Sequence, residues 1–162
     1  MTAIVGKFTP GALTYRARPV DLEGQPNWLL GQMWCMWQRT FARDTYRMCA
    51  TLLRHDWSVL ANTAWPPPLV DDPKRFTYVT GVGRANRGPG STLGGHMPAD
   101  APRDGEQWAY LWEHAGGALH VYRSAFERWH HLATLPVAVF ATLTPQLVAD
   151  IEERQDWLDR AV

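Results

Sequence analysis

The segment from Trp28 to Asn62 constrains the fold most, because its apolar residues keep the period of a helix. At about 100° per residue they fall on one stripe, which predicts a helix with one face against a core: Leu30, Trp34, Trp37, Phe41, Met48, Leu52 and Val59. Asn27 can cap its start, and the prolines at 66–68 stop any helix. An unbroken helix of this length would measure roughly 50 Å, so we allow for a break near His55, with Asp56 capping a second segment.

The opposite side of this predicted helix is basic. Its arginines recur at helical spacing and form a row: Arg39, Arg43, Arg47 and Arg54. A solvated face is the default interpretation. The row can instead face a protein partner, together with the nearby Trp57, or pair with acidic residues of the last helix. Nucleic-acid binding is the third alternative, and it is less favoured because only Tyr46 and Trp57 are near enough to stack on bases.

Length and charge limit the classes of protein to consider. A chain of 162 residues suits one domain, which we take as 1–162. The net charge of zero argues against broad attraction to nucleic acid or to an anionic membrane. The best apolar run, 132–143, is too short to span a bilayer and contains Pro136, and the N-terminal residues lack a signal-like apolar stretch. We expect a cytoplasmic protein with no membrane contact.

Three compositional features bear on origin and function. Arginine appears fourteen times and lysine only twice, a bias that suggests a GC-rich bacterium or one of its phages. Cys35 and Cys49 lie roughly 20 Å apart along the predicted helix, beyond disulfide reach, so both are expected to be reduced thiols. The nine tryptophans are several times the usual share, and tryptophan is enriched at binding hot spots.

Other segments have patterns typical of strands and loops. Residues 12–18 alternate in polarity, and 75–82 are rich in aromatic and β-branched residues, so both predict strands. The prolines at 66–73 predict a stiff, polyproline-like connection. Residues 83–105 contain many glycines and prolines without a hydrophobic period, which predicts a long, flexible loop.

The clearest local motif is a hairpin of residues 107–114 and 118–125, joined by a tight turn at Gly116-Gly117. That turn places Glu113 opposite His120. Alternation assigns one face to the core, namely Trp108, Tyr110, Trp112, Leu119 and Val121, and leaves the other half-exposed, namely Leu111, Glu113, His120, Tyr122 and Ser124. Segments 128–135 and 137–143 are expected to extend the hairpin into an antiparallel meander.

A final helix is predicted to start at Thr144-Pro145, an N-cap followed by proline. Its polar side is acidic: Glu152, Glu153, Asp156 and Asp159. The order of elements indicates an α+β fold in which the long amphipathic helix packs on one face of a mostly antiparallel sheet, with this C-terminal helix added.

The glycine-rich stretch 81–88 does not match a nucleotide-binding loop. A dinucleotide fingerprint needs glycine at Asn86 and a helix after it, and Pro89 stands where a Walker loop needs lysine. A flexible loop is the default, and an anion- or partner-binding loop that uses Arg84 and Arg87 is the alternative.

The predicted meander gathers several histidines. Glu113 with His120 is the candidate acid–base pair, assisted by His130 or His131. No pair has the spacing that usually places two imidazoles on one metal, and His130 and His131 point to opposite faces of a strand. We therefore expect no metal and no cofactor, and structural or surface histidines are the default interpretation.

No catalytic signature survives, whereas residues typical of interfaces are in excess. The leading hypothesis is a non-catalytic protein–protein interaction or assembly protein that associates with a partner or with itself, which fits a phage-encoded structural or host-modulating protein. A small enzyme using the meander histidines as an acid–base or metal site is the second class, and a nucleic-acid-binding protein using the arginine row is the third.

Overall fold

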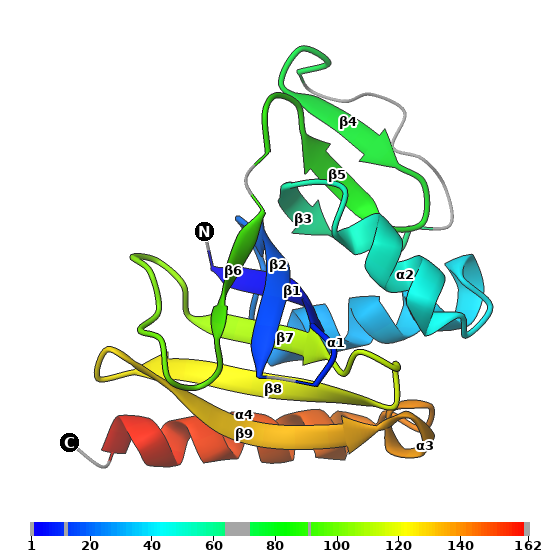
Figure 1. Cartoon of the computed structure of the whole chain (residues 1–162). Coiled ribbons are helices and arrows are strands. Elements are labelled where there is room, and N and C mark those ends of the chain that lie inside the picture. Colours follow the sequence, from blue (N-terminus) through cyan, green and yellow to red (C-terminus); the bar gives the residue numbers. More distant parts are fainter. Residues whose placement is uncertain (1, 12, 64–71, 91, 161–162) are drawn as a thin grey trace.

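The chain folds into a mixed β-sheet with helices, an α+β architecture (Figure 1). The computed structural model describes residues 2–11, 13–63, 72–90 and 92–160, without the side chain at 159. The strands are β1 (Ala3–Phe8), β2 (Thr14–Val20), β3 (Trp57–Leu60), β4 (Phe76–Val79), β5 (Gly83–Asn86), β6 (Leu93–His96), β7 (Trp108–Trp112), β8 (Ala118–Ala125) and β9 (Arg128–Pro136). The helices are α1 (Pro26–Cys35), the π-helical turn η1 (Met36–Thr40), α2 (Thr45–Leu52), α3 (Val137–Phe140) and α4 (Pro145–Arg160).

The strands are ordered β4-β5-β3-β2-β1-β7-β8-β9, and β6 pairs with the first half of β2. Parallel pairings join β1 to β7 and β2 to β3, and the other neighbours are antiparallel. The sheet is therefore mixed. The strand β1, which the sequence did not predict, lies between β2 and β7. It escaped detection because Ala3, Ile4 and Val5 are all fully buried, so the strand reads as an apolar run without alternation.

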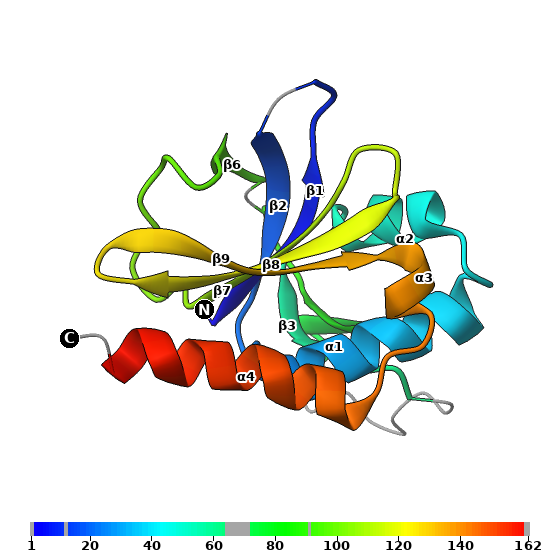
Figure 2. The ribbon, with the colours of Figure 1, turned by 90° about the horizontal axis from the view of Figure 1, so that it is seen from below.

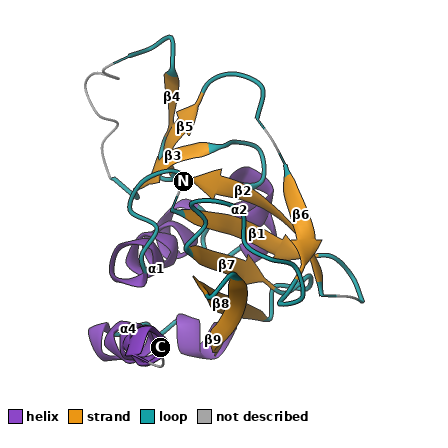
Figure 3. Cartoon of the chain, turned by 90° about the vertical axis from the view of Figure 1, so that its left-hand side faces the viewer, coloured by secondary structure: helices purple, strands orange, loops and turns teal. Residues whose placement is uncertain are grey.

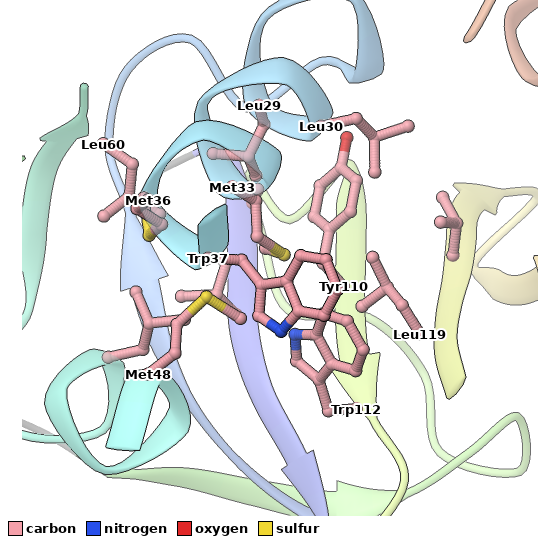
Figure 4. Close-up of a cluster of buried hydrophobic side chains, with 14 of the residues drawn as sticks. Leu29, Leu30, Met33, Met36, Trp37, Met48, Leu60, Tyr110, Trp112 and Leu119 are labelled. Carbon is pink, nitrogen blue, oxygen red and sulfur yellow. The ribbon is translucent and has the colours of Figure 1, made fainter. Parts of the chain in front are cut away.

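Both faces of the sheet carry a hydrophobic core. Figure 3 shows α1 and α4 on one side of the sheet and β6 on the other. The larger core lies under the helices, where Met33 and Trp37 meet Tyr110 and Trp112 (Figure 4). The smaller core lies on the opposite face and contains Ile4, Phe8, Tyr15, Ala17, Leu93, Met97, Ala109, Leu111, Tyr122 and Trp129. Alternation along β1 and β7 thus supplies both cores.

The prediction of a long helix over 28–62, broken at most near His55, is wrong, because the helix already breaks before α2 and the segment after His55 is the strand β3. The segment contains α1, η1, α2 and β3. The chain turns at Ala42 and Arg43, whose φ angles are 47° and 65°, and the carboxylate of Asp44 then accepts a hydrogen bond from the Arg47 backbone N–H at 3.0 Å, which caps α2. All four elements contribute side chains to the same core. Their apolar residues therefore recur along the sequence much as they would on one continuous helix, although the chain is broken.

Two strands lie within the predicted loop at 83–105. Ala85 of β5 and Leu93 of β6 are buried, although the short, glycine-rich segments show no hydrophobic period. Each strand has only four residues, too few to reveal a period of two. The proline-rich connection predicted at 66–73 lies mostly outside the described residues.

The region predicted as a meander is only partly as expected. Strands β7, β8 and β9 pair consecutively, but the predicted fourth strand at 137–143 is wrong, because it begins with helix α3. In the hairpin, Trp112 pairs with Leu119 and Leu111 with His120, a register two residues from the predicted one, because the loop after Trp112 is longer than two residues. A shift of two keeps each side chain on its face. The predicted start of α4 is confirmed: the Leu147 N–H donates to Oγ1 of Thr144 at 3.2 Å.

Candidate functional site

Three of the predicted histidine-site residues meet on the smaller-core face of the sheet. Nε2 of His120 lies 3.0 Å from Oε1 of Glu113, as expected for the pair. On its other side, Nδ1 of His120 lies 3.2 Å from Nε2 of His131. The hydroxyl of Thr134, which the sequence did not suggest, lies 3.2 Å from the same His120 nitrogen and 3.0 Å from the same His131 nitrogen. We call His120, His131, Thr134 and Glu113 the histidine cluster.

A β-bulge in β9 creates this cluster. His131 and Thr134 are three positions apart, so a regular strand would point them to opposite faces. The register shifts between Val121 and Tyr122, which pair with Ala133 and His131 respectively, so β9 holds one extra residue, Leu132. That extra residue returns Thr134 to the face of His131. A pattern of period two could not have found this contact.

Aromatic rings surround the cluster. The Phe8 ring meets the His120 ring edge-on at 5.6 Å, and the Tyr122 ring lies 5.1 Å from that of His131. Burial lowers the pKa of His131, and the neighbouring His120 adds to this effect. Burial likewise raises the pKa of Tyr122. His131 is therefore held more firmly in its neutral form than a free imidazole.

His130 does not join the cluster. Its Nε2–H donates to the backbone carbonyl of Ala125 at 3.1 Å, and it lines a groove between β9 and α4. This agrees with the expectation that adjacent histidines point to opposite faces. His130 thus provides a natural control for any role of His131.

The four arginines of the predicted row do not share one helix face. Arg39 lies in η1, Arg43 in the turn before α2, Arg47 in α2 and Arg54 after it. The guanidinium of Arg43 lies over the Trp37 ring, 5.4 Å from its centre. All four are exposed, but they belong to different elements and so do not form a row along one helix.

Glu152, on the acidic side of α4, contacts the start of α1 and not the arginine row. A carboxylate oxygen of Glu152 accepts the backbone N–H of Asn27 at 2.9 Å, at the start of α1. A carboxylate is stabilised at a helix N-terminus, where free N–H groups point outward. Among the ion pairs of the described residues, none joins an arginine of the row to α4.

The remaining candidate partner-binding residues differ in exposure. Trp57 is fully buried, with its indole N–H donating to the Leu52 carbonyl at 3.0 Å, so the proposal that it contacts a partner is wrong. Arg84 is half-buried, hydrogen-bonded to Oγ of Ser58 and placed 4.5 Å from the centre of the Phe76 ring. These contacts give Arg84 a structural role, whereas Arg87 is exposed.

Two grooves flank α4, and sequence reasoning missed both. One, of about 480 Å³, lies between α4 and β9 and is lined by Trp129, His130, His131, Leu132, Arg154, Trp157 and Leu158. The other, also about 480 Å³, lies between α4 and α1, which run side by side (Figure 2). Trp157 is 69% exposed at the rim of the first groove. The signal that could have found it is a tryptophan outside the apolar stripe of an otherwise acidic helix.

In comparisons with known proteins, no family model, no curated protein and no solved structure matches this chain. Among the described residues, no helix is both long and apolar enough to cross a membrane.

Proposed function

We propose that the protein is a non-catalytic assembly protein that associates with a second copy of itself through the solvent-facing side of α4. The observation that carries this proposal is the exposure of Trp157 beside the groove between α4 and β9. Large aromatic side chains contribute most of the binding energy at many interfaces when a partner removes them from water. An indole left in water next to an apolar groove is consistent with such a contact.

The charges around Trp157 suit a symmetric contact. Glu153 and Arg160 are exposed and lie about one helical turn on either side of it. In an antiparallel pair of α4 helices that cross at Trp157, Glu153 of one copy lies one residue from the position opposite Arg160 of the other. A twofold contact must be self-complementary in this way. Arg154, which also lies near this position, is bound within its own chain, because its guanidinium donates to the Leu132 carbonyl.

Light scattering on the purified chain tests this proposal. We expect a dimer for the wild type and a monomer for Trp157→Ser. The matched control is Tyr46→Ser, which removes another exposed aromatic ring, 74% exposed on α2, and should leave the dimer intact. A wild-type chain that stays monomeric up to about 1 mM, where association is worth only about 4 kcal/mol, refutes the proposal.

A charge exchange tests the symmetry of the contact. Arg160→Glu should weaken the dimer by repulsion from Glu153 of the other copy, and adding Glu153→Arg should restore it. Restoration in the double variant distinguishes this pairing from a non-specific loss of solubility. If the double variant is as weak as the single one, the antiparallel arrangement is wrong.

The enzyme alternative is supported by the hydrogen bond between His120 and Glu113 and by His130 and His131, which both line the groove between β9 and α4. A general acid–base pair must also face a space that holds a substrate. The cavity that Glu113 lines is formed with Lys7, Cys49 and His114, and His120 is not among its lining residues. The assembly proposal is therefore preferred.

A further inference from the structure

We propose that the histidine cluster is a binding site for a divalent transition-metal ion, with Zn²⁺ as the ion it fits, held by Nδ1 of His120, Nε2 of His131 and Oγ1 of Thr134. Both imidazoles direct a nitrogen to one point at the junction of β8 and β9. The three ligands lie on β8 and β9, and His131 also lines the groove between α4 and β9. The proposal is argued from the cluster alone and does not depend on the proposed self-association.

The spacing of the three atoms fits a tetrahedral ion. Their mutual distances are 3.2, 3.2 and 3.0 Å. A tetrahedral Zn²⁺ with donors at about 2.0–2.1 Å separates those donors by about 3.3 Å. An ion at that distance from all three atoms would lie roughly 1 Å out of their plane, which leaves the fourth position to water.

The second contact of His120 also matches a metal ligand. Its Nε2 faces the carboxylate of Glu113 at 3.0 Å, so the ring proton sits on Nε2 and Nδ1 presents a lone pair. Metal-binding histidines characteristically donate their other N–H to a carboxylate or carbonyl group, which fixes the ring and raises its basicity. Glu113 also supplies a negative charge near the site.

A cation can take the place of the proton that the two imidazoles share. Nδ1 of His120 and Nε2 of His131 lie 3.2 Å apart, and both lie within 3.2 Å of Oγ1 of Thr134. Without an ion, a proton on His131 or on Thr134 bridges these atoms. With His131 neutral and its Nε2 deprotonated, both nitrogens present lone pairs to the same point, and a bound cation interacts favourably with both.

The surroundings allow an ion to enter and to be held. The side chains of His120 and Glu113 are 19% and 47% exposed, so solvent reaches the cluster. The rings of Phe8 and Tyr122 flank the imidazoles and restrict their rotation. Arg154 carries a positive charge that acts against a bound cation, and its guanidinium is hydrogen-bonded to the Leu132 carbonyl.

Among the described residues, no group of three or more His, Cys, Asp or Glu side chains has metal-binding geometry. The proposed set has only two imidazoles, and a hydroxyl provides the third donor. We therefore expect weaker binding than at a site with three or four charged or imidazole ligands. We also expect the affinities for first-row divalent ions to follow the usual series for nitrogen ligands, so Cu²⁺ should bind more tightly than Zn²⁺.

The test is metal titration of a tag-free, chelator-treated chain at pH 7.5. Co²⁺ is followed by its visible absorption, which reports tetrahedral coordination, and Zn²⁺ by calorimetry. We expect one equivalent of each per chain. His120→Ala and His131→Ala should abolish binding. Glu113→Gln should lower the affinity for Zn²⁺ by about 10–100-fold.

His130→Ala is the matched control, because it removes a neighbouring imidazole that points away from the cluster, and it should bind as the wild type does. His131→Gln, on the exposed edge strand, replaces His131→Ala should that variant fail to fold. The absence of stoichiometric binding overturns the proposal. So does binding that survives loss of both His120 and His131, or that is lost equally in the control.

Discussion

The turn at Ala42 and Arg43 provides a direct test of the break that separates α1 and η1 from α2. Ala42 has a φ of 47°, in the left-handed region, where a residue with a Cβ is destabilised by about 1–2 kcal/mol. Glycine avoids that penalty but costs about 0.4–1 kcal/mol through the greater freedom it gives the unfolded chain. The difference predicts that Ala42→Gly raises the free energy of unfolding by roughly 0.5–1 kcal/mol.

The matched control is Ala149→Gly, on an exposed position inside α4, which should lower the free energy of unfolding by about 1 kcal/mol. Urea denaturation followed by circular dichroism measures both changes, and thermal midpoints should move by about 2–4 °C per kcal/mol. The two variants should thus differ in sign. If Ala42→Gly destabilises the protein as much as Ala149→Gly does, position 42 is helical and the broken helix is wrong.

Three further predictions concern buried or half-buried groups. The Tyr110 hydroxyl donates a hydrogen bond to a backbone carbonyl at 2.8 Å in the core. Tyr110→Phe should therefore lower the free energy of unfolding, measured by urea denaturation, by about 1–3 kcal/mol, whereas Tyr46→Phe on the surface should not. Equal effects of the two variants would count against the buried hydrogen bond. Burial lowers the pKa of His55 below its ordinary 6.5, so the unfolded chain takes up this proton first and stability should fall as the pH drops below about 6.5. His55→Gln should reduce that slope in a pH series of urea midpoints, and an unchanged slope would show that His55 does not cause it. Burial raises the pKa of the Cys49 thiol to about 12, whereas Cys35 is half-buried. A thiol reagent should therefore modify Cys35 in the native protein and Cys49 only after unfolding, as measured by mass spectrometry of the labelled peptides. Labelling of both cysteines at the same rate would contradict this packing.

The predictions that succeeded rest on local patterns. The division of the hairpin residues between two faces was correct although the register was wrong, because a shift of two residues preserves alternation. The prediction that the second face is half-exposed was wrong for Leu111 and Tyr122, because both pack in the smaller core. The start of α4 follows from Thr144 and Pro145 alone. The contact between Glu113 and His120 was found because both side chains lie on one face of the same hairpin.

The predictions that failed concern contacts between distant segments. Trp57 looked accessible as part of a helix, but it is buried because β3 adds to the sheet beside β2 and β5. The strand β1 was missed because it is buried on both faces, and burial on both faces removes the alternation that marks a strand.

The sequence by itself determined where apolar and polar side chains occur along each short element, and this was enough for the α+β class, the hairpin faces and the last helix. Only the tertiary structure decided that the segment 28–62 breaks into helices and a strand, since every piece packs on the same core and periodicity cannot distinguish them from one helix. It also decided the histidine cluster, because a single extra residue in β9 turns Thr134 to the face of His131. Periodicity reports which side of an element is buried, whereas a bulge, a register or a neighbouring strand depends on residues far away in the chain.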